Sequence, residues 1–234
     1  MAQFVFDAPA VPTVAVAGEA ARFPVRRIFC VGRNYAEHAR EMGQDPEREP
    51  PFFFTKPADA LVADGERIPY PPLTANLHFE GEMVIAIGKS GFAIDEATAL
   101  GHVWGYAAGN DLTRRDLQSV AKSKGQPWDW GKAFDRSAVC GAVVPATHIG
   151  HPARGRITTH VNGGLRQQAD LSDMIWPVPS IIAFLSRSVR LMPGDLVYTG
   201  TPAGVGALQI GDECRVTIEA IGAVAVTIGA REDI

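Results

Sequence analysis

The chain alternates short apolar runs with polar and turn-forming residues over most of its length. These runs have the length of β-strands, and each is bounded by Gly, Pro, Asn or Asp, as strands usually are. The pattern predicts strands over residues 27–31, 52–55, 83–88, 103–109, 138–144, 156–161, 195–199, 213–219 and 223–228.

A helical period is found in fewer places. We predict helices over Tyr35–Met42, Thr113–Ser123 and Pro179–Ser188. The first ends at Gly43, a residue that favours a helix C-cap. The second has Thr113 and Asp116 at the spacing of a capping box. The predicted inward faces consist of Leu117, Val120 and Ala121 in the second helix and Ile181, Ile182 and Leu185 in the third.

The predicted strands outnumber the helices and do not alternate with them in a βαβ order, so the fold class is α+β with β-structure dominant. The composition agrees, because 24 Gly and 17 Pro in 234 residues favour many turns and exclude a helical bundle. Residues 1–24 are rich in Pro, Ala and Val and are predicted to be a short lead-in packed on the main body. Residues 25–234 then form one domain of catalytic size.

Charge and hydropathy narrow the classes of partner. The net charge of −4 and the absence of a stripe of Lys and Arg argue against nucleic-acid binding. No apolar run approaches the ~18 residues of a membrane-spanning helix. The N-terminus lacks a signal peptide's basic region, and Cys30, Cys140 and Cys214 are few, odd in number and widely spaced, which favours a reducing cytoplasm.

Acidic side chains precede one of the most apolar predicted strands. On a strand, His78, Glu80 and Glu82 would share one face. Two neighbouring carboxylates repel each other unless a cation lies between them, and oxygen ligands suit Mg²⁺ or Mn²⁺ better than Zn²⁺. An arbitrary pair of this kind more often lies on a solvated strand edge, so the pattern alone leaves both interpretations open.

A second polar segment lies where a predicted strand gives way to a helix. Asp111 at this corner would supply a third oxygen to a metal, and Arg115, Gln118 and Lys122 follow on one helical face that can point into a cleft. Taken alone, Asp111 as a helix cap and Arg115 as a solvated side chain explain the segment at least as well.

Two further segments carry candidate chemistry. Lys132 lies among aromatic residues, where it either extends past the Trp rings or faces an anion in a pocket. His38 and Glu41 are three residues apart on a predicted helix and can therefore touch. A carboxylate that orients an imidazole raises its basicity, which prepares it to activate water. The alternative is an ordinary surface ion pair.

Together these segments resemble the fumarylacetoacetate hydrolase family over residues 26–229. The resemblance rests on six motifs in the order found in that family: GRNYAEHAREMG (32–43), HFEGE (78–82), GNDLTRRDLQ (109–118), WGKAFD (130–135), LMPGDLVYTGTPAGVG (191–206) and IGDECRVTIEAIG (210–222). It implies a mixed β-sandwich roll with a central cleft and, for the assembly, a homodimer.

The resemblance also implies roles for the candidate residues. One Mg²⁺ or Mn²⁺ per chain would bind to Glu80, Glu82 and Asp111. His38 and Glu41 would lie on a mobile lid and activate water, and Lys132 would face the oxyanion of the substrate. The remaining contacts, to carboxylate or keto oxygens of the substrate, would come from Arg115, Gln118 and Thr201.

The implied activity is hydrolysis of the carbon–carbon bond of a 2,4-diketo acid, an acylpyruvate. The runs FVFDAP, PVRRIFCVGRNYAEHA and PPFFFTKPADAL most resemble members that act on fumarylpyruvate in aromatic degradation. The alternatives are decarboxylation of an oxaloacetate-like acid or isomerisation of a diacid on the same fold. A non-catalytic protein that binds a small acid would be expected to lack the His38–Glu41 pair or Lys132, and all three residues are present.

Overall fold

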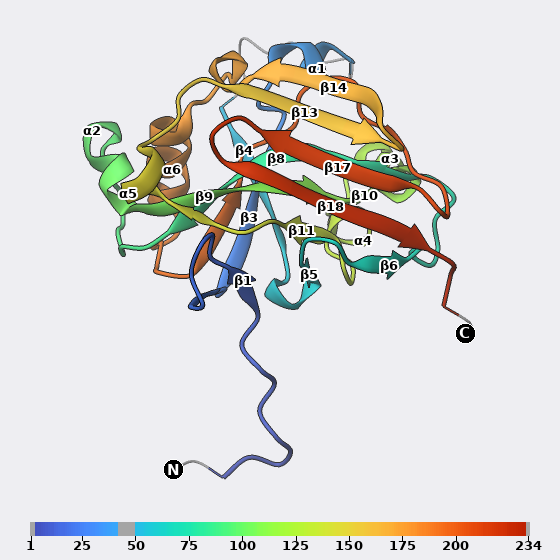
Figure 1. Ribbon diagram of the computed structural model, residues 1–234, viewed down its shortest axis with the longest axis horizontal. Helices are drawn as coiled ribbons and strands as arrows, with labels where there is room; N and C mark the ends of the chain where they lie inside the picture. Colours follow the sequence, from blue (N-terminus) through green and yellow to red (C-terminus); the bar gives the residue numbers. More distant parts are fainter. Residues whose placement is uncertain (1–2, 42–49, 233–234) are drawn as a thin grey trace.

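Two packed β-sheets form the centre of the computed structural model, which describes residues 3–41 and 50–232 (Figure 1). The larger sheet has the order β4-β3-β15-β8-β9-β11-β5, with β12 paired to β9. Its strands are β4 (Phe52–Lys56), β3 (Arg27–Gly32), β15 (Asp195–Tyr198), β8 (Gly81–Ile87), β9 (Val103–Asp111), β11 (Ala138–Cys140), β5 (Leu61–Val62) and β12 (Val144–Pro145). Every residue of β8 is buried, as expected for a strand covered on both faces.

The smaller sheet has the order β14-β13-β17-β18-β6. Its strands are β14 (Gly164–Asp170), β13 (Arg156–Val161), β17 (Glu213–Ile218), β18 (Gly222–Gly229) and β6 (Arg67–Pro69). Residues alternate between exposed and buried along β17, with Cys214, Val216 and Ile218 turned inward. These side chains join the core that β17 and β18 share with β9. Burial of each large aliphatic side chain there contributes about 1.5–3 kcal/mol.

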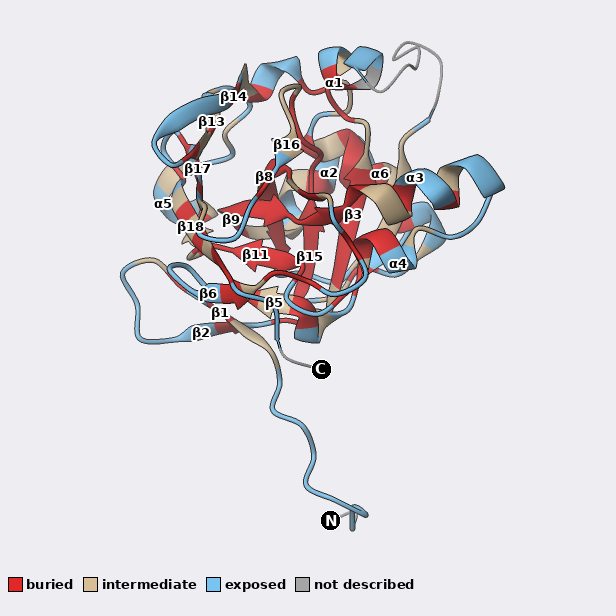
Figure 2. Ribbon diagram, turned by 90° about the vertical axis from the view of Figure 1, so that its right-hand side faces the viewer, coloured by how far each residue is buried: buried red, intermediate tan, exposed pale blue. Residues whose placement is uncertain are grey.

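Two minor sheets complete the strand structure. Strand β7 (Leu77–Phe79) pairs with β10 (Thr113–Arg114) and with β16 (Gly206–Ala207) in a separate three-stranded sheet. Strands β1 (Thr13–Ala15) and β2 (Arg22–Pro24) form an antiparallel pair whose Val14 and Phe23 are buried in a second apolar cluster. Before β1, the chain is exposed and extends away from the body (Figure 2).

Short helices cover the edges of the sheets. They are α1 (Ala36–Glu41), α2 (Glu96–Ala99), α3 (Arg115–Lys124), α4 (Asp129–Lys132), α5 (Ala146–Ile149) and α6 (Val178–Ser188), with 3₁₀ turns η1 (Ala58–Ala60), η2 (Leu100–His102) and η3 (Leu171–Asp173). In α6, Ile181, Ile182 and Leu185 are buried as predicted. No helix in the described residues is long and apolar enough to cross a membrane. The predicted α+β class with dominant β-structure is confirmed.

The helix predicted to begin at Thr113 differs from the observed one. Thr113 belongs to β10, pairs with His78, and donates its hydroxyl hydrogen to the carbonyl of Asp111, so the predicted capping box is wrong. Asp116 instead accepts hydrogen bonds from the Thr74 hydroxyl and the Ala75 amide. α3 therefore begins at Arg115 without a side-chain cap.

The predicted apolar face of α3 is confirmed at Ala121 and wrong at Val120. Val120 is 47% exposed, whereas the polar side chains of Arg115 and Gln118 are buried together with Ala121. The polar face of this helix points inward because it borders a charged cavity instead of an apolar core. The predicted end of the first helix, at Met42 and Gly43, lies outside the described residues.

Two strand predictions also need correction. The run predicted as one strand over residues 138–144 is divided into β11 and β12, and the amide of Gly141 between them bonds to the carbonyl of Ala108. Strand β14 was not predicted, because its outer face is exposed and mostly polar. The turn before it held the signal: Asn162 and Gly163 both have positive φ, as a two-residue hairpin turn requires.

Candidate active site

Three buried carboxylates meet where β8 and β9 pair. Glu82 lies on β8, Glu80 directly precedes that strand, and Asp111 ends β9. The antiparallel register sets Gly81 opposite Asn110, and the Asp111 amide bonds to the carbonyl of Glu80. One oxygen from each of the three carboxylates lies within 4.8 Å of the others. Two segments that are about thirty residues apart in sequence are thus joined by a ladder of backbone hydrogen bonds.

Cationic side chains compensate two of the three carboxylates. Lys132 Nζ lies 2.7 Å from Glu80 Oε2 and 2.7 Å from Asp111 Oδ2, and Arg115 pairs with Glu80 through its guanidinium. Although burial opposes it, the charges of Lys132 and Arg115 hold the pKa of Glu80 well below its usual range. Glu80 therefore stays ionised although it is buried.

Glu82 lacks such a partner. Its side chain accepts a hydrogen bond of 2.7 Å from the Gly200 amide and forms no ion pair within the described part of the chain. Burial, followed by the charges of Asp111 and Glu80, raises the pKa of Glu82 well above its usual value. A divalent cation among the three carboxylates would remove this cost, and an all-oxygen donor set suits Mg²⁺ or Mn²⁺. The residues present fit such an ion.

Lys56 is a member of the site that the sequence prediction missed. Its buried Nζ lies 2.8 Å from Asp111 Oδ1 and donates to the carbonyls of Leu112 and Lys132. The only signal in the sequence was that a lysine ends the apolar run FFFTK, where a buried charge would need a polar partner. Its carboxylate partner is fifty-five residues further along the chain.

Gln167 on β14 is a second residue that the prediction missed. Its Oε1 accepts a hydrogen bond from the Gly81 amide, and its Nε2 donates to the Thr201 hydroxyl and the Pro202 carbonyl. The Thr201 hydroxyl in turn donates to the Gly81 carbonyl. This closed ring holds the backbone between Glu80 and Glu82, and it places Thr201 on the wall of the site.

The absence of a side chain at Gly81 is required by packing. A Cβ at Gly81 would lie 2.2 Å from Thr159 Oγ1. We therefore expect Gly81→Ala to lower the free energy of unfolding by about 1–3 kcal/mol, the usual cost of overpacking, as measured by urea denaturation. In the double variant with Thr159→Ala, the nearest remaining atoms lie at 3.2 Å, so part of the stability should return.

Gly101→Ala is the matched control for this prediction, because no atom lies within 4 Å of the added Cβ. Equal unfolding midpoints for Gly81→Ala and the unmodified protein would contradict the close packing of β13 against the segment that carries the two glutamates.

His38 and Glu41 lie on α1, next to the carboxylates. His38 Nδ1 is 3.2 Å from Glu41 Oε2, which also accepts a hydrogen bond from the Gly204 amide. If Nδ1 carries the proton toward Glu41, Nε2 is free to accept one. Burial lowers the pKa of His38, opposed by the charges of Glu80 and Glu41, so the imidazole is neutral at pH 7.

His78 does not join the acidic group. It contacts the Asn76 side chain through Nε2 and lies 3.5 Å from Arg115 Nε through Nδ1. Burial, followed by the nearby charge of Arg115, lowers the pKa of His78 to about 4. The expectation that one strand face carries His78 with both glutamates fails because β7 ends at Phe79, before Glu80.

A small cavity of about 30 Å³ connects these groups. This volume is enough to hold a water molecule. The cavity is lined by Val31, Gly32, Arg33, His38, Phe54, Glu80, Glu82, Arg115, Gln118, Lys122, Trp128, Lys132 and Thr201. With Asp111 bonded to Lys132 and Glu41 bonded to His38, every residue that the sequence suggested for the site lies at this cavity or contacts a residue that lines it.

The family assignment follows from a comparison with known proteins. The sequence model for the fumarylacetoacetate hydrolase C-terminal domain matches residues 27–229. The chain belongs to the fumarylacetoacetate hydrolase family. The mixed β-roll expected for this family is the fold observed here.

Members of the family with assigned activities are similar to the chain over most of its length. The fumarylpyruvate hydrolase of a Ralstonia species is 46% identical over 80% of this chain and 97% of its own. A mitochondrial oxaloacetate tautomerase of Homo sapiens is 42% identical over 84% of this chain and 88% of its own. The crystal structure of fumarylpyruvate hydrolase from Pseudomonas aeruginosa in complex with Mn²⁺ and pyruvate superposes with a TM-score of 0.96 and 49% identity, covering 98% of this chain and all of that one.

Proposed function

We propose that this protein hydrolyses fumarylpyruvate, a 2,4-diketo acid, to fumarate and pyruvate. The proposal rests on a buried triad of carboxylates, one of which has no cationic partner among the described residues, beside a neutral histidine that is paired to a glutamate. The similarity to fumarylpyruvate hydrolases over nearly the whole chain supports the choice of substrate. The corresponding biological role is aromatic-compound catabolism.

Glu80, Glu82 and Asp111 would hold one Mg²⁺ or Mn²⁺ ion. The bound ion would supply a Lewis acid that lowers the energy of the enolate formed in the reaction, worth several kcal/mol. Arg115, Gln118 and Thr201 would bind the carboxylate and keto oxygens of the pyruvate part. Of these, Arg115 already bonds to both Gln118 and Glu80, so its guanidinium is fixed in orientation before a substrate arrives.

His38 would act as the general base. Oriented by Glu41, its Nε2 would take a proton from water, whose oxygen forms a new bond to C4 of the substrate. The C3–C4 bond then breaks, its electron pair remains on the pyruvate part as an enolate, and protonation at C3 yields pyruvate. Lys132 would stabilise the negative charge of the enolate oxygen. The α1 segment that carries His38 and Glu41 would serve as a lid over this reaction.

The pH dependence of turnover tests the role of His38. Because burial lowers its pKa below the ordinary value of 6.5, the neutral base should persist below that pH, and activity should fall only as the pH drops through the lowered pKa. Profiles of kcat from about pH 4.5 to 8 at saturating Mn²⁺ would show this acid limb. Glu41→Gln removes a charge that raises the pKa, so the limb should move to lower pH. An acid limb centred above 6.5 would contradict the assignment.

A second candidate is the interconversion of the keto and enol forms of oxaloacetate, or its decarboxylation. It is favoured by the similarity to oxaloacetate tautomerases, which nearly equals that to the Ralstonia hydrolase. Both activities pass through the same kind of enolate, but only hydrolysis needs a water molecule activated at a distal carbonyl.

One comparison separates the two candidates. Fumarylpyruvate, acetylpyruvate and oxaloacetate are offered side by side with Mn²⁺, while loss of the diketo-enol absorbance, pyruvate, fumarate and CO₂ are measured. The proposal predicts that fumarylpyruvate is the best substrate and that fumarate and pyruvate form in equal amounts. Rapid enolisation or CO₂ release from oxaloacetate without cleavage of either acylpyruvate would favour the second candidate.

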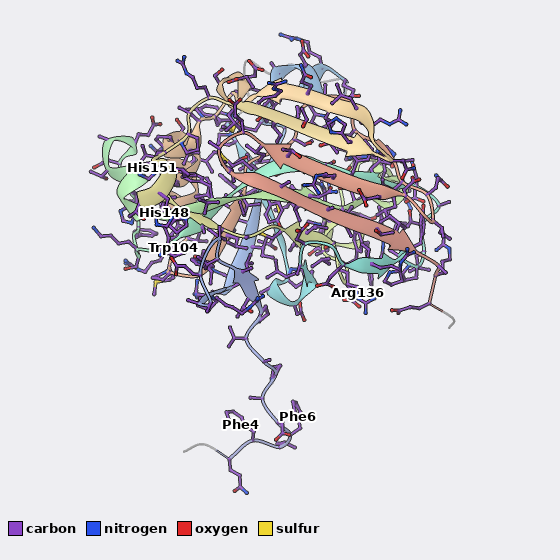
Figure 3. The ribbon with its side chains drawn as sticks, in the orientation of Figure 1. Phe4, Phe6, Trp104, Arg136, His148 and His151 are labelled. Carbon is purple, nitrogen blue, oxygen red and sulfur yellow. The ribbon has the colours of Figure 1, made fainter. Side chains whose placement is uncertain are left out.

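We further infer a cytoplasmic homodimer. Three buried, unpaired cysteines suit a reducing compartment. The extended N-terminal arm carries Phe4 and Phe6, which are 69% and 79% exposed and lie away from the body of the protein (Figure 3). Exposed aromatic side chains of this kind mark interaction surfaces, and a second copy of the chain would cover them.

A further inference from the structure

The charges around the cavity are not balanced evenly. On one side, Lys56, Lys132 and Arg115 are each bonded to a carboxylate of the triad. On the other side, Lys122 forms no ion pair and no side-chain hydrogen bond with any described residue, although it lines the same cavity. It follows Arg115 and Gln118 at positions i, i+3 and i+7 of α3, so the three side chains share a face of the helix.

Aromatic rings hold the cations on this second side. Lys122 Nζ lies 5.4 Å from the centre of the Trp128 ring, and the Arg33 guanidinium lies 5.0 Å from the centre of the Phe52 ring. Both distances are within the range of a cation–π interaction. The Trp128 ring positions Lys122 without neutralising its charge, so the positive potential at Lys122 remains available to an anion.

The backbone conformation of Arg33 and the charges around Lys122 are both consistent with an anion-binding site. Arg33 has φ of 59°, a left-handed conformation that costs a residue with a Cβ about 1–2 kcal/mol. Such outliers cluster at binding sites. Partial burial, followed by the charges of Arg33 and Arg115 and opposed by that of Glu80, lowers the pKa of Lys122.

A second cavity lies next to these residues. A larger cavity of about 400 Å³ adjoins the first and shares Phe54, Trp128 and Lys132 with it, and Phe52 and Phe53 extend the aromatic wall. A flat, conjugated acyl chain that leaves the acidic triad would run along these rings. Lys122 and Arg33 line the smaller cavity and not the larger one, whose lining also includes Asp129. An acyl chain that stays on the smaller cavity's side of the shared Trp128 ring would therefore bring its far end to Lys122.

We propose that Lys122, with Arg33 beside it, forms a second anion subsite that binds the carboxylate at the distal end of the acyl group. The enzyme would thereby select dicarboxylic acylpyruvates over those that end in a methyl group. This inference rests on the proposed hydrolysis of acylpyruvates and adds the residue that determines the choice among them.

The test compares fumarylpyruvate with acetylpyruvate in the Mn²⁺-loaded enzyme and in Lys122→Gln. Loss of a charge-assisted hydrogen bond should lower kcat/KM for fumarylpyruvate by about 10- to 100-fold, mainly through KM. The value for acetylpyruvate should fall much less, by under about threefold, because its acyl group offers no anion. Lys122→Arg should keep most of the preference, and Lys124→Gln, an exposed residue on the same helix, should leave both values unchanged.

The possible results discriminate between explanations. An equal fall for both substrates would show that Lys122 binds the common pyruvate part, and no fall for either would show that it binds nothing; either result overturns the inference. Calorimetry with fumarate and its monocarboxylic counterpart crotonate gives a readout that needs no turnover. The unmodified protein should prefer fumarate and Lys122→Gln should not. If this preference is seen but no acylpyruvate is cleaved, the proposed hydrolysis fails and the subsite stands.

Discussion

Replacing Glu82 with glutamine is expected to lower kcat/KM for fumarylpyruvate by about a thousandfold or more and to abolish tight Mn²⁺ binding. Glutamine keeps the shape of the side chain and can still accept the hydrogen bond from the Gly200 amide. It removes the carboxylate of the triad to which the described part of the chain offers no cationic side chain. Stabilisation of several kcal/mol by a bound cation corresponds to at least three powers of ten in rate. Steady-state kinetics and Mn²⁺ titration by calorimetry measure both effects.

The same substitution should have the opposite effect on the stability of the metal-free protein. A carboxyl group whose pKa is raised on folding destabilises the folded state above its ordinary pKa, because it must ionise among like charges or take up a proton. The metal-free variant should therefore melt several degrees higher at pH 7, at about 2–4 °C for each kcal/mol. Glu96→Gln, on the exposed first turn of α2, is the control and should change neither property. A variant that loses activity but binds Mn²⁺ normally would contradict the assignment of the triad.

Replacing His38 with alanine is expected to lower kcat for fumarylpyruvate by about 10²- to 10⁴-fold, the usual contribution of a general base. Mn²⁺ affinity should stay near that of the unmodified protein, because no atom of His38 belongs to the acidic triad. This separation of turnover from metal binding distinguishes a base from a ligand. Kinetics at saturating Mn²⁺ and a parallel metal titration provide the two values.

His148→Ala is the matched control for the His38 variant. His148 is an exposed histidine on α5, away from the residues that line the cavity (Figure 3). It should leave kcat unchanged. Normal turnover by His38→Ala would refute the assignment of the base and would shift attention to the alternatives that need no activated water.

Strands with one face on the core and one face in solvent were predicted well, because their apolar and polar residues alternate. Strand β13 has the predicted bounds, and β17 differs by one residue, because their alternating side chains face a single core. For α3, the predicted apolar face was wrong at Val120, whereas the polar face of Arg115 and Gln118, which the spacing allowed to point into a cleft, is buried. Hydrophobic periodicity assumes that polar side chains face solvent, and Arg115 and Gln118 face a charged cavity instead.

Only some residues of the site could be found from the sequence, because local patterns do not show contacts between distant segments. Glu80 and Glu82 could be grouped from sequence because they lie two residues apart, and local spacing also paired His38 with Glu41. Lys56 and Gln167 could not be found in this way, since their partners lie at distant positions that only the strand order brings together. Residues that support a site through long-range register leave little local pattern to detect.

In the proposed reaction, activated water attacks C4 of an acylpyruvate and the C3–C4 bond then breaks. The most direct measurement is a reaction of fumarylpyruvate with the Mn²⁺-loaded protein in H₂¹⁸O, with mass analysis of the products and of recovered substrate to correct for exchange of its keto oxygens. We expect one solvent oxygen in the newly formed carboxylate of fumarate and an equal amount of pyruvate. Release of CO₂, or isomerised substrate with no fumarate formed, would contradict it.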